Sequence, residues 1–318
     1  MAKGKKRPRF SGARFRDLAL SRISFPGTKP TGSNLMAHFG AVGILFSAAL
    51  LSASYGTWAQ TLASNSEPNK AQISIETKYV KISLTVDSDL RPFTELFAGC
   101  LAEGKAWAMQ KNNDAAAEWR DSRKAFREVQ WFYDRDYILR SVIGRYVSVV
   151  RSDDWFDGGA HPNQHADTIL WDNVARKRIN IRALFTETAD KGPTMSALAQ
   201  AAKLAIAAAK LAKGINGYDD DTPAVQNMTP EQEIEHDSFI KNGIKPAILA
   251  IGPVTLAPST ETGKSSGLTF HYSPYGVGPY VEGPYTVFVP WTAFRQYLSP
   301  RGAALFGGER PRGDEETW

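Results

Sequence analysis

Residues 129–150 read VQWFYDRDYILRSVIGRYVSVV, and this stretch decides which kind of fold the chain adopts. Apolar and polar residues alternate through much of it, and aromatic and β-branched residues are frequent. A period of two residues places alternate side chains on opposite faces of a strand. The stretch therefore predicts two antiparallel strands joined by a turn between Arg140 and Gly144.

The sequence on the N-terminal side of this hairpin predicts another strand pair and then a helix. Residues 73–86, ISIETKYVKISLTV, alternate in the same way with a β-branched bias. Between residues 88 and 126 the period changes, because Phe93, Leu96 and further apolar residues recur at helical spacing. Residues 71–157 thus form a first unit with the order β, α, ββ.

The sequence on the C-terminal side predicts a second unit over residues 158–300. It begins with two antiparallel strands around a polar turn, and an Ala-rich helix follows Pro193 and ends at Lys213-Gly214. Thr229 and Gln232 have the spacing of a capping box at the start of the next helix. The expected elements are strands at 164–172, 177–185, 247–255 and 268–290, a polar hairpin tip at 259–267 and a helix at 291–298.

Strands and helices lie in separate runs along the chain, which is typical of α+β proteins. We therefore predict an α+β fold with an antiparallel sheet, helices packed on one of its faces, and two consecutive units. Residues 301–318 are rich in Gly, Pro and charge, so we expect a flexible tail there.

The positive charge lies outside these units. The chain has 38 Lys and Arg against 33 Asp and Glu, but residues 1–59 hold nine of the basic side chains and one of the acidic ones. The remainder carries 29 basic and 32 acidic side chains, a net charge of −3. A nucleic-acid-binding surface on the folded part is therefore not expected.

The N-terminal residues predict export. A basic segment, 1–34, precedes residues 35–59, which are apolar and end in small residues before Gln60. Two interpretations stay open, a cleaved signal peptide and an uncleaved membrane anchor. In both, the basic segment stays in the cytoplasm, residues 60–70 form a linker, and the rest is periplasmic or anchored to the inner membrane facing the periplasm.

The single cysteine, Cys100, excludes a disulfide within the chain. It lies among apolar residues at helical spacing, so we expect a small buried side chain there.

The stretch WFDGGAHPNQH, residues 155–165, looks most like a chemical site. His161 and His165 are four apart and could bind zinc with a nearby acid, but glycines and a proline break the helix that this spacing would need. We therefore predict no metal site and no cofactor. We expect Gly158 and Gly159 to form a structural turn, and His161 to make hydrogen bonds there or to contact a ligand.

The stretch YSPYGVGPYVEGPY, residues 272–285, is the stronger candidate for a binding surface. Its tyrosines are separated by Pro and Gly, and rigid amphipathic rings are favoured where proteins contact sugars or other proteins. The predicted binding residues are His161, Tyr272, Tyr275, Tyr280 and Glu282.

Several of these motifs resemble one family of exported proteins. They are GGAH at 158–161, INIRALF at 179–185, and LTFHYSPYGVGPYVEGPYTVFVPWTAFRQYL at 268–298. The second unit resembles the C-terminal domain shared by RsiV-type anti-sigma factors and PdaC-type peptidoglycan deacetylases, and the first unit is similar to the domain that precedes it there. The resemblance implies a role in the cell envelope, since the RsiV type binds lysozyme through this region and starts a proteolytic cascade.

The sequence departs from both types of protein. Residues 1–34 show no apolar helical pattern that would bind a sigma factor, and the metal pattern of the deacetylase domain is not seen. The expected function is therefore a non-catalytic envelope module that binds a lysozyme-like muramidase or peptidoglycan. The alternative is an envelope hydrolase that uses His161 with a nearby acid.

Overall fold

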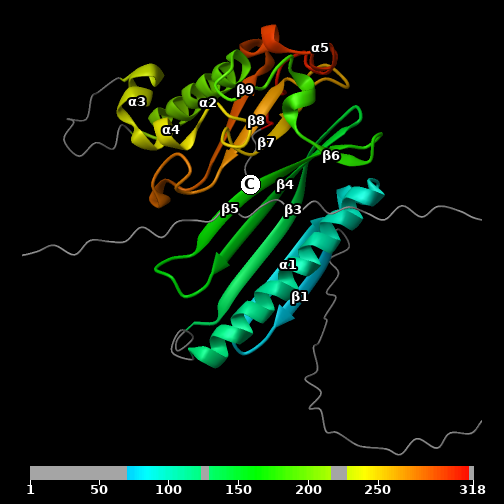
Figure 1. Ribbon diagram of the computed structural model, residues 1–318, viewed down its shortest axis with the longest axis vertical. Helices are drawn as coiled ribbons and strands as arrows, with labels where there is room; N and C mark the ends of the chain where they lie inside the picture. The colour runs from blue at the N-terminus through cyan, green and yellow to red at the C-terminus, as the bar shows by residue number, and fades with distance from the viewer. Residues whose placement is uncertain (1–69, 123–128, 216–227, 315–318) are drawn as a thin grey trace, which may run out of the picture. The chain divides into compact units, whose positions relative to one another are not determined.

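The structure is a computed structural model in which residues 70–122, 129–215 and 228–314 are described (Figure 1). All described residues belong to one compact unit, Trp58–Trp318. The predicted basic segment and the predicted signal peptide or anchor at 35–59 lie outside the described residues. The fold class is α+β, as predicted, with a six-stranded sheet, a three-stranded sheet and helices.

The six-stranded sheet has the strand order β1-β2-β3-β4-β5-β6. Its neighbours pair antiparallel, as predicted, except β2 and β3, which are parallel. The long helix α1 connects these two strands, and a crossover of this length is what a parallel pair requires. The elements are β1 Lys70–Glu76, β2 Val80–Asp87, α1 Thr94–Asp121, β3 Trp131–Ile143, β4 Tyr146–Phe156, β5 Asn163–Asp172 and β6 Lys177–Ile179.

Helix α1 runs along the sheet and covers one of its faces (Figure 1). Alternate residues of β2, from Val80 to Val86, are fully buried, and Leu96 and Cys100 of α1 pack in the same core. Gly104 allows α1 to approach closely, because a side chain there would overlap the methyl groups of Leu84. The prediction that Cys100 is a small buried residue is confirmed.

The three-stranded sheet has the order β7-β8-β9 and packs against α2. Every residue of β8 is buried, because helix and sheet layers cover both of its faces. The expected continuous strand at 268–290 is two antiparallel strands, β8 and β9, joined by residues 273–284. The elements are α2 Pro193–Ala212, α3 Pro230–His236, α4 Ser238–Gly243, β7 Val254–Ala257, β8 Gly267–Tyr272 and β9 Tyr285–Pro290.

Side-chain hydroxyl groups join the two sheets. Ser141 Oγ donates to Leu256 O at 2.7 Å, and Ser148 Oγ accepts from Leu256 N at 3.1 Å. Since β4 also pairs along its length with β5, the sheet continues across the predicted unit boundary at 157/158. Residues 158–300 therefore contribute β5 and β6 to the same sheet as residues 71–157, and both segments lie in one compact unit.

Strand β6 pairs with only the last three residues of β5. Along the rest of that edge, side chains accept hydrogen bonds from backbone N–H groups of β5. Ser273 Oγ accepts from Ala166 N at 2.9 Å, and Asp167 Oδ1 accepts from Thr168 N at 2.7 Å. Thr168 Oγ1 in turn accepts from Val254 N at 3.0 Å.

Helix α2 is the one helix in the described ranges that is long and apolar enough to cross a membrane, judged by length and composition alone. Leu198, Ala202 and Ile206 are nevertheless buried in the core with the three-stranded sheet. The helix ends as its sequence predicts, since Gly214 has a φ of 73°. The capping box of Thr229 and Gln232 at the start of α3 is also present.

The expected strand at 177–185 is shorter than predicted. Strand β6 ends at Ile179, and a 3₁₀ helix, Ile181–Leu184, follows it. The Asn180 side chain accepts a hydrogen bond from Arg182 N at 2.9 Å and so begins this helix.

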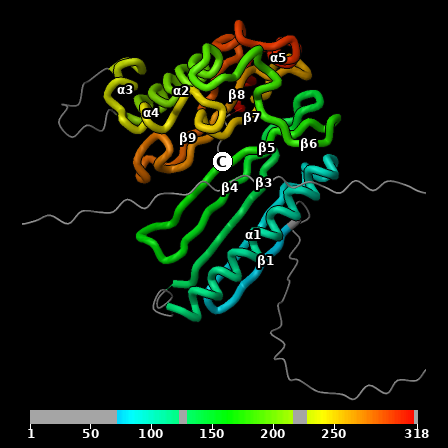
Figure 2. Tube along the Cα trace, viewed as in Figure 1, coloured from blue at the N-terminus to red at the C-terminus, as the bar shows by residue number. Residues whose placement is uncertain are grey.

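The predicted flexible tail at 301–318 was wrong for the residues that the structure describes. Helix α5, Pro300–Leu305, follows two short 3₁₀ turns that stand where a helix was expected at 291–298. Leu305 and Phe306 are buried, so their apolar area stabilises a segment whose overall composition is that of a loop. Ser299 N donates to Leu184 O at 3.0 Å, and Figure 2 shows this C-terminal segment, in red and orange, beside the green residues after β6.

Candidate functional site

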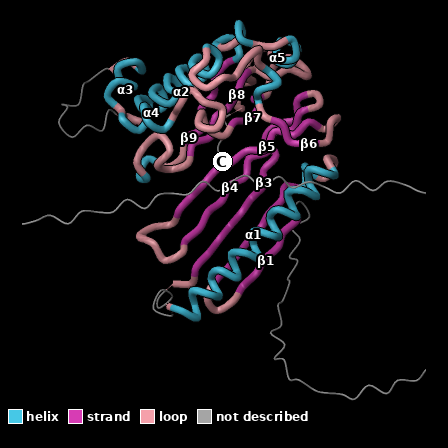
Figure 3. The backbone as a smooth tube through the Cα atoms, viewed as in Figure 1, coloured by secondary structure: helices cyan, strands magenta, loops and turns pink. Residues whose placement is uncertain are grey.

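The connection between β8 and β9, which in Figure 3 is mostly loop with a short 3₁₀ helix, Tyr280–Glu282, places two tyrosines against His161 from the β4–β5 connection. The ring centroids of His161 and Tyr280 are 3.9 Å apart with an angle of 24° between the planes. Tyr275 completes the group, with its ring centroid 6.1 Å from His161 and 5.7 Å from Tyr280. We call His161, Tyr275 and Tyr280 the aromatic cluster.

Hydrogen bonds fix the His161 ring in this cluster. Nδ1 lies 2.7 Å from Pro162 O, and Nε2 lies 3.2 Å from the hydroxyl of Tyr275. A carbonyl oxygen only accepts, so Nδ1 is the donor to Pro162 O. Neither partner is a carboxylate, so these contacts orient the ring without providing the acid that the predicted hydrolase would use.

Tyr275 is held in an unfavourable backbone conformation. Its φ is 67°, in the left-handed region that costs a residue with a side chain about 1 to 2 kcal/mol. Its side chain is 56% exposed, so burial of the ring does not offset this cost. Strain of this kind is concentrated at sites that contact ligands.

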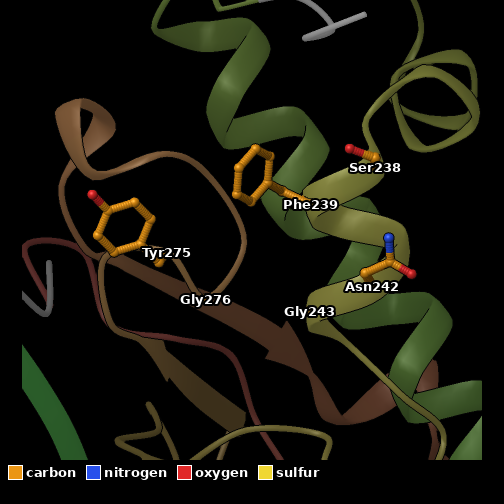
Figure 4. Close-up of a pocket in the computed structure, with 6 residues that line it drawn as sticks. All are labelled: Ser238, Phe239, Asn242, Gly243, Tyr275 and Gly276. Atoms are coloured by element: carbon orange, nitrogen blue, oxygen red, sulfur yellow. The ribbon is translucent and has the colours of Figure 1, made fainter. Parts of the chain in front are cut away.

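A pocket of about 320 Å³ adjoins the aromatic cluster. It lies between α4 and the 273–284 loop, and Figure 4 shows the Phe239 ring projecting from α4 toward the loop that carries Tyr275. Gly243 and Gly276 let the two backbones meet, because a side chain on Gly243 would overlap Gly276 O. The lining combines two aromatic rings with polar groups: Ser238, Phe239, Asn242, Gly243, Tyr275 and Gly276.

Two of the five predicted binding residues lie inside the protein. Tyr272 is 4% exposed, and its hydroxyl donates to Ile251 O at 2.8 Å. Glu282 has a side chain that is 1% exposed, and its Oε2 accepts from the Tyr285 hydroxyl at 2.5 Å. These residues anchor the ends of the loop, whereas Tyr275 is exposed and Tyr280 and His161, from the β4–β5 connection, are partly exposed.

Glu282 belongs to a buried charge cluster, which we define as Lys210, Asp237 and Glu282. Lys210 Nζ contacts Asp237 Oδ2 and lies 3.3 Å from Glu282 Oε2. Lys210 and Asp237 are both 0% exposed. Sequence reasoning missed this cluster, although one signal was available: Lys210 follows Ala202 and Ile206 at intervals of four, on the buried face of α2.

The second histidine of the suspected metal motif, His165, and the buried His271 have separate partners. His165 Nδ1 lies 3.3 Å from Ser273 Oγ, and His271 is buried with its Nε2 2.9 Å from Thr255 Oγ1. Across the described ranges no group of three His, Cys, Asp or Glu residues could hold a metal ion. Gly158 has a φ of 88°, which the tight connection requires, whereas Gly159 lies outside that region.

Part of the chain matches a known domain family, and solved structures are similar to the chain. Two solved structures are similar to this chain. One is a DUF3298 family protein from Pseudomonas aeruginosa, which is 17% identical with a TM-score of 0.47; the match covers 76% of this chain and 97% of that chain. The other is a DUF3298 family protein from Bacteroides fragilis, which is 14% identical with a TM-score of 0.46; the match covers 74% of this chain and 94% of that chain. No curated protein matches. Residues 183–292, which include α2, β7 to β9 and both tyrosines of the aromatic cluster, match the family described as "Protein of unknown function (DUF3298)".

Proposed function

We propose that this protein is a non-catalytic binding module of the cell envelope whose aromatic cluster contacts the ligand. The observation that carries the proposal is the exposed, strained Tyr275, packed with His161 and Tyr280 beside the pocket on α4. Rigid aromatic rings give a large contact area at a low entropy cost, and the pocket adds polar groups that can orient a ligand.

The ligand we propose is a lysozyme-like muramidase or peptidoglycan. The resemblance to RsiV-type and PdaC-type proteins supports an envelope ligand, and the apolar segment before residue 60 supports export. Both ligands present groups that aromatic rings recognise, namely sugar faces in peptidoglycan and mixed apolar and polar side chains in a protein.

Binding assays on the purified protein test the proposal. Immobilised lysozyme and insoluble peptidoglycan are compared as ligands, and Tyr275→Ala and Tyr280→Ala are compared with the wild-type protein. Removing a central aromatic residue from an interface costs about 2 kcal/mol or more, so each variant should bind at least about 30-fold more weakly. Met109→Ala is the matched control, because Met109 is 55% exposed on α1, outside the aromatic cluster.

The outcomes separate the ligands. Binding to only one of them that both tyrosine variants lose identifies that ligand. Binding that survives both substitutions would exclude the aromatic cluster as the contact surface, and the absence of binding to either ligand would refute the proposed class. Release of soluble fragments from peptidoglycan, assayed in parallel and abolished in His161→Ala, would favour the hydrolase instead.

A further inference from the structure

The buried charge cluster holds an amine and two carboxyl groups in contact and away from water. Lys210 and Asp237 are fully buried, and the Glu282 side chain is 1% exposed. Lys210 Nζ contacts Asp237 Oδ2 and lies 3.3 Å from Glu282 Oε2. Fully ionised, these three groups would place one positive and two negative charges in the interior.

The contact between Lys210 and Asp237 places the two groups of an amide-forming reaction side by side. Removing ions from water costs several kcal/mol for each ion, so an interior site favours reactions that consume charged groups. The first step of such a reaction would be transfer of one proton from Lys210 Nζ to Asp237 Oδ2, within the contact that already joins them. The amine is then a nucleophile, and the carboxyl carbon is the group that it can attack.

The geometry points to an amide bond between Lys210 and Asp237, formed by the folded protein without another enzyme. Nζ of Lys210 attacks Cγ of Asp237, the Nζ–Cγ bond forms, and the Cγ–Oδ2 bond breaks. One hydrogen of the amine and the hydroxyl of the acid leave together as water. Nothing is oxidised or reduced, and no co-reactant is consumed.

The two oxygens of Asp237 are distinguished by their partners. Oδ1 accepts a hydrogen bond from Ile240 N at 3.0 Å, where it caps the start of α4. Oδ2 is the oxygen in contact with Lys210. Departure of Oδ2 therefore leaves Oδ1 as the carbonyl oxygen of the amide, which still accepts from Ile240 and preserves the cap.

Glu282 is placed to move the proton. Its Oε2 lies beside Lys210 Nζ and is oriented by the Tyr285 hydroxyl, while its Oε1 is buried without a hydrogen-bond partner among the described residues. We assign Glu282 the role of taking a proton from the attacking nitrogen and passing one to the departing oxygen. Gly278 makes room for this carboxyl group, because a side chain at Gly278 would lie 2.8 Å from its Cδ.

The fold favours this condensation by holding the amine and the carboxyl group in contact. Reactive groups that a fold holds together reach very high effective concentrations, and the absence of water opposes hydrolysis of the product. The bond would join the last turn of α2 to the start of α4 and replace a buried amine and a buried carboxyl group with an amide. It does not depend on the proposed binding function, so the failure of one leaves the other standing.

Mass spectrometry of the purified full chain tests the bond. The folded protein, analysed after denaturation, should have lost one water, about 18 Da, and a protease digest should contain one branched peptide joining Lys210 to Asp237. Lys210→Arg and Glu282→Gln should restore the full mass. Lys203→Arg should retain the loss, because Lys203 lies on the same helix, is partly buried and is outside the cluster.

The digest of the wild-type protein decides the outcome even where a variant does not fold. Separate, unmodified peptides containing Lys210 and Asp237 from folded protein would overturn the inference. A loss of water that maps to a cyclised aspartate elsewhere would also overturn it. Glu282→Gln protein that folds and still carries the branched peptide would remove Glu282 from the reaction, and with it the proton transfer proposed here.

Discussion

Two glycines, each within a helix, should respond in opposite ways to the same substitution. Gly243 is the last residue of α4, and an added methyl group would overlap Gly276 O and lie 3.0 Å from Gly276 C and 3.1 Å from Val277 Cγ1. Gly99 lies in α1, is exposed, and has nothing within 4 Å of the position that a methyl group would take. Gly99→Ala is therefore the matched control for Gly243→Ala.

The magnitudes follow from two opposing effects. Alanine is favoured over glycine inside a helix by about 1 kcal/mol, so Gly99→Ala should raise the free energy of unfolding by about 0.5 to 1 kcal/mol. Gly243→Ala has at most the same gain, but overpacking a close contact costs about 1 to 3 kcal/mol. The obstructing atoms are backbone, which cannot rotate away, so we expect the upper end of that cost and a net loss of about 2 kcal/mol.

Urea unfolding of the wild-type protein and both variants at pH 7 measures these changes. The slope of free energy against urea should be unchanged, so the midpoints alone should move, in opposite directions. Gly243→Ala should also weaken ligand binding, because relief of the overlap moves the loop that carries Tyr275. Equal midpoint shifts for the two variants would refute the close backbone contact on which the pocket depends.

Three further predictions concern ionisable groups. Burial raises the pKa of the Cys100 thiol to about 12, so a thiol reagent should modify Cys100 only after denaturant unfolds the protein; rapid modification under native conditions would contradict its burial. Burial, together with the charge of Arg140, lowers the pKa of His271 to about 3. Between pH 6.5 and pH 3 the unfolded chain therefore binds a proton that the folded chain does not, so the free energy of unfolding should fall by up to about 1.4 kcal/mol per pH unit as the pH decreases. NMR of the folded protein at pH 5 should show a neutral His271 ring. Although burial opposes it, hydrogen bonds from Ala175 N–H and Arg145 lower the pKa of Asp172, so its stabilisation is present above about pH 4 and is lost at lower pH. Asp172→Asn should cost about 2 to 4 kcal/mol at neutral pH in urea unfolding, with a smaller cost at pH 3.

Local sequence signals predicted most of the elements. The period of two in residues 131–143 and the spacing of Thr229 and Gln232 specify a strand and a helix start that depend on neighbours in the chain. The parallel pairing of β2 with β3 was not predictable in this way, because it depends on where α1 packs. The same is true of Leu305 and Phe306, since two apolar residues in a polar segment do not reveal that a core lies within reach.

The candidate site was predictable only in part. Composition singled out the loop of Tyr275 and Tyr280, but it does not show which aromatic residues point outward. Tyr272 was included because it begins the same Tyr-rich stretch, although it is the last residue of β8, all of whose residues are buried. The pairing of Lys210 with Asp237 joins residues 27 positions apart, so no local pattern marks it.

The side-chain bonds along the outer edge of β5 bear on how the protein behaves at high concentration. An edge strand with open N–H groups can recruit a strand from another copy and so begin aggregation. Here the N–H groups of Ala166 and Thr168 are already engaged by Ser273 and Asp167. Ser273, which comes from the start of the loop that carries Tyr275 and Tyr280, therefore shields the sheet from self-association while Tyr275 beyond it stays exposed.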